Sequence, residues 1–130
     1  MSKSAFSLRV FSIYMFALGS VLVGAPNLLL TFFGIPETQE VWIRVVGMLV
    51  LIIGYLDFMA SSCEVLVFFR WSVPARLSVP VFFVAFVVLG LAPPILLLFG
   101  AIDFAAAIWT AFSLRADGST QPGAPADVAR

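Results

Sequence analysis

Long uncharged stretches dominate the sequence and set its predicted secondary structure. The first covers residues 10–33, the second covers 41–60 with one charge near each end, and the third covers 77–114 with a single charge, Asp103. A helix needs about 20 apolar residues, each adding roughly 1.5 Å, to cross a membrane, because a backbone in lipid must satisfy its own hydrogen bonds. The pattern therefore predicts transmembrane helices in all three stretches.

The third stretch is too long for one crossing. A single helix would extend about 57 Å, nearly twice the hydrocarbon thickness of roughly 30 Å. Pro93 and Pro94 divide it, and Pro94 suits a first helical turn because its missing N–H needs no partner there. In the first stretch, Pro26 leaves open a helix end followed by a short interfacial segment over 28–33. We predict four transmembrane helices, over residues 8–30, 41–60, 75–92 and 94–114.

Composition supports this prediction and excludes several kinds of functional site. Of 130 residues, 62% are hydrophobic and 11% are charged, against about 25% charged in soluble domains. We therefore predict an all-α polytopic membrane protein, with one four-helix transmembrane domain over residues 1–114. Seven Lys and Arg balance seven Asp and Glu, so no basic surface for nucleic acid exists. The chain has no His and one Cys, which excludes His-ligated metals and His-based dyads and argues against an enzyme.

The positive-inside rule predicts the orientation of the four helices. One side of the membrane would carry Glu37 and Glu40 with Arg44 nearby, and the other side nearly all remaining cationic residues. We expect both termini and the loop 61–76 in the cytoplasm, in the cytoplasmic membrane of a bacterium. Residues 115–130 are small and polar and are predicted to form a disordered cytoplasmic tail. The cationic residues on the cytoplasmic side would be Lys3, Arg9, Arg70, Arg76, Arg115 and Arg130.

Asp103 is the most informative polar residue of the predicted helices. It lies roughly 13 Å beyond Pro94 along the last helix, near the membrane midplane, where an unpaired carboxylate is costly. Two interpretations stay open: a protonatable site or ligand anchor, or a carboxyl that holds the bundle together by hydrogen bonding. Arg44 is the only plausible cationic partner within the membrane, but we favour the interpretation in which it snorkels to the outer headgroups and does not meet Asp103. Asp57, near the cytoplasmic end, is a further candidate.

Small residues at helical spacing predict where the helices pack. Gly47 and Gly54 lie on one face of the second helix, and Gly100, Ala107 and Thr110 share the Asp103 face of the fourth. Thr110 adds a hydroxyl to the candidate polar site. We expect the second and fourth helices to pack together within one chain, with a seam between identical chains as the alternative.

Aromatic residues raise the question of a ligand. Tyr14, Tyr55 and the fourteen Phe would line a pocket for an apolar molecule such as a quinone or a lipid, although aromatic residues also fill lipid-facing surfaces. Tyr55 joins the candidate polar site for this reason. No motif in the sequence requires a cofactor.

One stretch of sequence carries a family resemblance. Residues 33–36 (Phe-Gly-Ile-Pro) follow the first predicted helix, and Gly47 and Gly54 space the second. Together with the four helices, this pattern over residues 11–114 resembles the DoxX-like group of small bacterial membrane proteins. The resemblance implies an accessory role beside redox or quinone-linked membrane enzymes, and identifies no active site.

Three functional hypotheses follow from these patterns. The first is a non-enzymatic accessory or anchoring subunit, whose partners would be membrane lipids and a membrane protein or further copies of itself. The second is a bundle that conducts protons or small solutes by means of Asp103. The third is a protein that binds a lipid or a quinone.

Overall fold

The computed structural model describes residues 1–119 and contains five helices in that range. Four of them are long and apolar enough to cross a membrane, which confirms the predicted all-α class with four such helices. The fifth, α2, is short. The helices are α1 (Lys3–Gly24), α2 (Pro26–Phe32), α3 (Trp42–Ser62), α4 (Leu66–Val88) and α5 (Leu96–Ser119).

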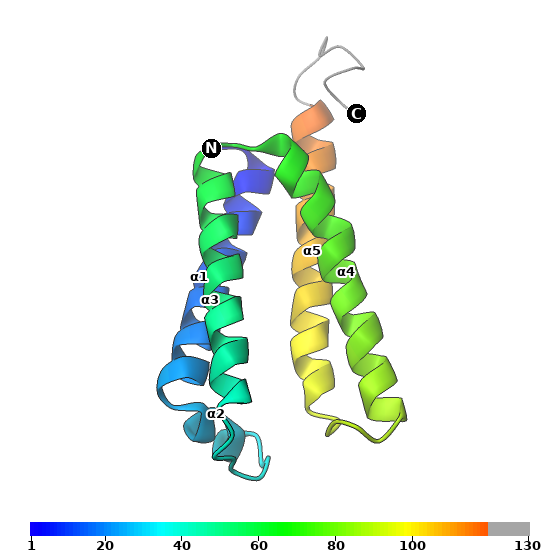
Figure 1. Cartoon of the computed structure of the whole chain (residues 1–130). Helices are drawn as coiled ribbons and strands as arrows, with labels where there is room; N and C mark the ends of the chain where they lie inside the picture. The colour runs from blue at the N-terminus through cyan, green and yellow to red at the C-terminus, as the bar shows by residue number, and fades with distance from the viewer. Residues whose placement is uncertain (120–130) are drawn as a thin grey trace.

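The four long helices form two pairs. The helix α1 packs along α3, α4 packs along α5, and the contact between α1 and α5 joins the pairs (Figure 1). The start of α1 and the end of α5 lie at the same end of the molecule, here called the termini end. The short helix α2 lies at the opposite end, here called the α2 end.

Glycine residues bring α1 and α3 into close contact. A Cβ atom built on Gly47 would lie 2.7 Å from the Leu22 Cβ, and one on Gly19 would lie 2.7 Å from the Leu51 Cγ. Gly54 faces α1 in the same way, 3.0 Å from the Met15 Cβ. The small-residue face of α3 therefore packs on α1, not on α5 as expected, because α1 provides a groove that fits it.

The first predicted helix, over 8–30, is two helices in the structure. Ala25 leaves helical geometry with φ −145° and ψ 65°, and Pro26 begins α2 at its first turn. The physical reason is that a proline disfavours helical geometry in the residue before it and suits the first helical turn. The alternative with a helix end at Pro26 is the arrangement found.

The helix α4 differs most from its predicted bounds. It runs from Leu66 to Val88 and contains Pro74 and Pro80, whereas the prediction was 75–92. The apolar residues 66–69 begin this helix. It continues past both prolines because a transmembrane helix tolerates an internal proline when its freed carbonyl is compensated locally. The left-handed Gly90, with φ 74°, follows its end. Residues 61–76 are therefore not one loop.

The helix α5 also extends further than predicted, from Leu96 to Ser119 instead of 94–114. Asp117 explains the extension, because its carboxylate accepts hydrogen bonds from the backbone N–H groups of Lys3 and Ser4 at 3.1 and 2.9 Å. It thereby caps the start of α1. Of the predicted disordered tail, 115–119 are helical, and 120–130 lie outside the described residues.

The termini end holds a small apolar core. Ala5, Leu8, Ala60 and Phe69 are buried there and come from α1, α3 and α4. The Ser2 N–H donates to Glu64 Oε1 at 2.7 Å, which ties the start of the chain to the turn between α3 and α4. This end of the molecule is therefore closed by packing and hydrogen bonds.

Candidate functional site

A pocket of about 350 Å³ lies between the two helix pairs, in the half of the molecule nearer α2. Its size is at the lower end of the range of small-molecule pockets, roughly 300–1,000 Å³. Every helix contributes to its wall. The lining residues are Tyr14, Met15, Leu18, Leu22, Leu29, Leu30, Phe33, Ile35, Val46, Val50, Val79, Phe83, Leu96, Phe99 and Asp103.

Helical spacing explains why these side chains share one space. Tyr14, Leu18 and Leu22 recur every fourth residue along α1, so they lie on one face of that helix. Phe99 and Asp103 have the same spacing on α5. The pocket is the place where these faces meet.

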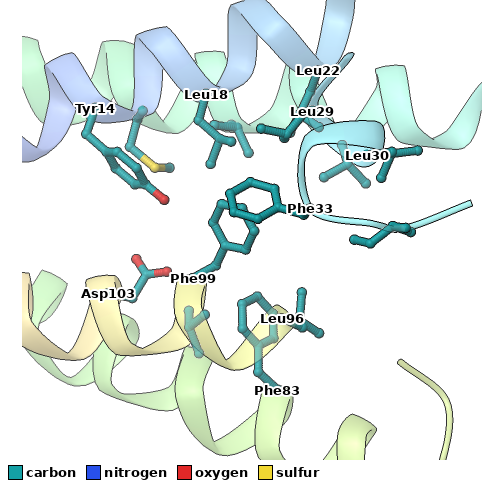
Figure 2. A pocket seen from close by; sticks show the side chains of 15 residues that line it. Tyr14, Leu18, Leu22, Leu29, Leu30, Phe33, Phe83, Leu96, Phe99 and Asp103 are labelled. Carbon is teal, nitrogen blue, oxygen red and sulfur yellow. The ribbon is translucent and has the colours of Figure 1, made fainter. Parts of the chain in front are cut away.

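The pocket is apolar along most of its length and polar at one end. Figure 2 shows the Tyr14 hydroxyl and the Asp103 carboxyl pointing toward one another across the pocket, while Leu29, Leu30 and Leu96 lie toward the α2 end. The Tyr14 side chain and the Asp103 carboxyl interact electrostatically. A molecule in this space would meet hydrocarbon along its length and two polar groups at its inner end.

Arg76 lies behind this polar end, toward the termini end. Its side chain is only 7% exposed, and its guanidinium carbon lies 4.6 Å from the centroid of the Phe11 ring. Nη2 donates to Thr110 Oγ1 at 3.0 Å, and the Ser7 and Thr110 hydroxyl oxygens lie 3.0 Å apart. This network joins α4, α5 and α1.

Three charged residues from three helices gather around this network. The Arg76 guanidinium interacts electrostatically with the carboxyls of Asp57 on α3 and Asp103 on α5. Asp57 is 4% exposed. We call Asp57, Arg76 and Asp103 the charged cluster. With both carboxyls ionised its formal charge is −1, so one negative charge has no cation within the cluster.

The guanidinium of Arg76 is incompletely hydrogen-bonded. Within residues 1–119, its buried Nε and Nη1 atoms have no hydrogen-bond partner. Buried donors in proteins are nearly always satisfied, and a donor without a partner calls for an explanation such as a bound molecule. Of the three residues of the charged cluster, Asp103 lines the pocket, whereas Arg76 and Asp57 are buried behind it.

The structure brings together part of the predicted polar site. Asp103, Asp57 and Thr110 all belong to the network around Arg76. Tyr55 does not, because it is 55% exposed on the outer face of α3. Arg44 is also exposed, and its guanidinium donates to the Val23 carbonyl near the α2 end.

Arg44 therefore does not pair with Asp103, and the identification of Arg44 as the only plausible cationic partner is wrong. The cation near Asp103 is Arg76, which the sequence analysis placed in a cytoplasmic loop. The reason is the early start of α4 at Leu66, which moves Arg76 from a loop into the interior. Its spacing to the lining residues Val79 and Phe83, three and seven residues along, is the pattern that could have revealed it.

The remaining predicted packing residues belong to helix contacts outside this network. A Cβ on Gly100 would lie 3.3 Å from the Cα of Pro80, so Gly100 packs against α4. Ala107 is fully buried, one helical turn beyond Asp103. Gly47 and Gly54 lie in the contact between α1 and α3.

Comparisons with known proteins identify no relative. No family model matches the chain, and neither a curated protein nor a solved structure matches it. Among residues 1–119, no group of three or more Cys, Asp or Glu is placed to hold a metal ion. The resemblance to DoxX-like proteins stays a prediction, and function must be argued from the pocket and the charged cluster.

Proposed function

We propose that this membrane protein binds a lipophilic molecule, of the lipid or quinone kind, in the pocket between its helix pairs. The single observation that carries the proposal is the pocket's composition: hydrocarbon walls from all five helices, and two polar groups together at the inner end. Ligand pockets typically combine apolar walls with a few polar groups that fix orientation. The ligand's polar head would contact Tyr14 and Asp103, and its tail would point toward the α2 end.

The arrangement of the helices supports access from the lipid. Val46 and Val50 of α3 and Val79 and Phe83 of α4 line the pocket on opposite sides, and these two helices belong to different pairs. A pocket of about 350 Å³ suits a head group with part of a chain. The rest of a long chain would extend between the pairs into the bilayer.

Photolabelling tests this proposal. The probe is dodecanol with a diazirine in its chain, added to the protein in lipid nanodiscs and mapped by mass spectrometry. We expect saturable labelling of pocket residues such as Leu29 and Leu96. Leu18→Trp, which fills the pocket, should abolish that labelling, and the matched variant Leu56→Trp, on an exposed face of α3, should retain it.

Labelling that is confined to lipid-facing residues, or that is equal in both tryptophan variants, would contradict the proposal. Each variant would first be checked for its helix content by circular dichroism and for a single symmetric peak in size-exclusion chromatography. A loss of labelling in a folded Leu18→Trp variant then reports occupancy of the pocket.

In this proposal the protein acts as an accessory membrane subunit that holds a lipophile for a partner. The observation that favours this role is the small mass outside the helices: the connections 33–41, 63–65 and 89–95 are short. The DoxX-like resemblance points to the same role beside a redox or quinone-linked enzyme. Co-purification of a membrane-protein partner in mild detergent tests the role, and a protein that purifies alone or only with copies of itself would contradict it.

The packing at the termini end argues for binding rather than conduction. Ser7, Leu8, Ala107 and Thr110 are each at most 1% exposed and lie between Asp103 and that end. A conducting path through Asp103 would need water-accessible space there. In proteoliposomes we therefore expect no difference in proton flux between the wild-type protein and Asp103→Asn, and a flux that this substitution abolishes would favour conduction.

We also propose that the protein spans a bacterial cytoplasmic membrane with both termini in the cytoplasm. Lys3, Arg9, Arg70 and Arg115 lie in the termini-end halves of their helices, while Arg44 lies near the α2 end. This distribution follows the positive-inside rule even though Arg76 is buried in the interior.

A further inference from the structure

The inner end of the pocket carries hydrogen-bonding groups of both kinds. Asp103 offers a carboxylate, which accepts hydrogen bonds when ionised, and Tyr14 offers a hydroxyl that donates or accepts. Behind them, the buried Nε and Nη1 of Arg76 carry N–H groups without a partner within the described chain. A head group that both donates and accepts would satisfy the two pocket groups, Tyr14 and Asp103, together.

Arg76 lies behind the two groups that would contact the head. It lies three residues before Val79 and seven before Phe83, so the three share one face of α4. Val79 and Phe83 line the pocket, and Arg76 continues their face by one turn toward the termini end. Arg76 acts electrostatically on the Asp103 carboxyl but is not among the residues that line the pocket.

The net charge of the charged cluster further limits the kinds of head group that the pocket would bind. The charged cluster has a formal charge of −1 with both carboxyls ionised, so a carboxylate or phosphate head would add a like charge beside Asp103 in surroundings of low polarity. An ammonium head has donors only, so it could not accept a hydrogen bond from the Tyr14 hydroxyl. A hydroxyl is uncharged, donates to a carboxylate and accepts from an N–H or O–H group.

Building on the proposed function, we propose that Tyr14 and Asp103 select lipophilic alcohols, which are molecules with an uncharged hydroxyl head on an apolar chain. The hydroxyl donates to the Asp103 carboxylate and accepts from the Tyr14 hydroxyl. The apolar chain lies along the Leu18 and Phe99 side of the pocket. Acids of the same chain length are disfavoured by the like charge of Asp103, and amines offer no acceptor to the Tyr14 hydroxyl.

A matched probe series tests this selection. Dodecanol, dodecanoate and dodecylamine, each with a diazirine at the same carbon, are applied at neutral pH to the protein in nanodiscs. Pocket labelling is divided by labelling of lipid-facing residues on the same protein, which corrects for the different partitioning of the probes. We expect dodecanol to exceed dodecanoate in this ratio by on the order of tenfold.

Two substitutions that each remove one negative charge distinguish a direct contact with the head group from the effect of the cluster's net charge. Asp103 lines the pocket, whereas Asp57 belongs to the charged cluster without lining it. Asp103→Asn should raise dodecanoate labelling and reduce the preference for the alcohol to about twofold, because a charge next to the head group is lost. Asp57→Asn should reduce the preference less. An equal effect of both variants, or no effect of either, would overturn the proposal.

A third variant keeps the test decisive if Asp103→Asn does not fold. Tyr14→Phe removes one hydroxyl and retains the ring that lines the pocket. It should lower dodecanol labelling by about threefold and leave dodecanoate labelling unchanged, because a single neutral hydrogen bond to the head is lost. Unchanged dodecanol labelling in this variant would contradict the assigned role of Tyr14.

The possible outcomes distinguish this inference from the function on which it rests. Equal pocket labelling by all three probes, or a preference for the acid or the amine, would overturn the head-group selection and leave pocket binding intact. Pocket labelling by none of the probes would overturn both. A preference for dodecanol that Asp103→Asn reduces more than Asp57→Asn supports both.

Discussion

Thr110 connects the buried guanidinium to the rest of the interior. It is fully buried, its hydroxyl accepts a hydrogen bond from Arg76 Nη2, and it also donates to the Ala106 carbonyl at 3.1 Å. Burying a cation is costly unless it is paired and hydrogen-bonded, and here the Phe11 ring and the Thr110 hydroxyl supply part of what water would provide. Loss of this hydroxyl would leave Nη2 with only its longer hydrogen bond to Ser72 Oγ at 3.3 Å.

We therefore expect Thr110→Val to destabilise the protein. The substitution keeps the shape of the side chain but removes the acceptor, at a cost of about 1–3 kcal/mol in unfolding free energy. The matched control is Thr31→Val, whose hydroxyl donates to Glu37 at an exposed position and whose loss should cost less than about 0.5 kcal/mol. Thermal unfolding in detergent measures both, and equal stability of the two variants would show that the buried network contributes little.

At the scale of whole helices, the contact between α1 and α3 depends on the absence of side chains. A Cβ on Gly47 would meet both the Leu22 side chain at 2.7 Å and the backbone nitrogen of Val23 at 2.9 Å. A backbone atom cannot move aside as a flexible side chain can, so one helix must shift. This shift would change the shape of the pocket, because Leu22 and the neighbouring Val46 line it.

Gly47→Ala should accordingly lower the unfolding free energy by about 1–3 kcal/mol, as overpacking does in tightly packed cores. Gly24→Ala is the control, because a Cβ on Gly24 has no atom within 4 Å among the described residues. A shift of the melting temperature that is the same for both variants would mean that the α1–α3 contact is looser than the structure shows.

The bounds of α4 could not be predicted from sequence patterns alone. The number of crossings could be predicted, because length and lack of charge are local properties of the chain. The start of α4 could not, because Arg70, Trp71 and Pro74 are typical of an interfacial loop and only packing against α5 shows them to be helical. Because of that error, Arg76 was predicted to lie in a loop, and Arg44 was considered the only plausible cationic partner of Asp103.

Residues that act together through space were harder to predict than residues that act alone. Asp103 could be singled out because a carboxylate in the middle of an apolar helix is unusual in any arrangement. Its neighbours Tyr14 and Arg76 come from other helices, and their meeting depends on the order in which the helices pack. The same order decides that Gly47 and Gly54 face α1 rather than α5.

For the whole molecule, the orientation in the membrane can be tested with its single cysteine. Cys63 is exposed, follows the end of α3 and lies at the termini end. In intact bacterial cells that express the protein, a membrane-impermeant maleimide should not label Cys63 until the membrane is opened. With Cys63→Ser and Gln39→Cys combined, labelling of intact cells should occur, because Gln39 is exposed near the other end. The reverse pattern would contradict cytoplasmic termini.

The whole molecule is a pair of helix pairs closed at the termini end and separated by an apolar pocket in the other half. Hydrogen bonds from the start of α1 to Asp117 and Glu64 hold the closed end together. In the proposed function, the other half accepts a molecule from the bilayer. This division between a closed end and a half that contains the pocket is the basis of the proposed function.

The most direct test of this account is native mass spectrometry of the protein extracted from the membranes of its host in mild detergent, with identification of what stays bound. The account predicts a near-stoichiometric lipophilic molecule with a hydroxyl head on the wild-type protein and on Leu56→Trp, and its loss from Leu18→Trp. A wild-type protein without a bound lipophile, or one that is retained equally by Leu18→Trp, would contradict binding in the pocket.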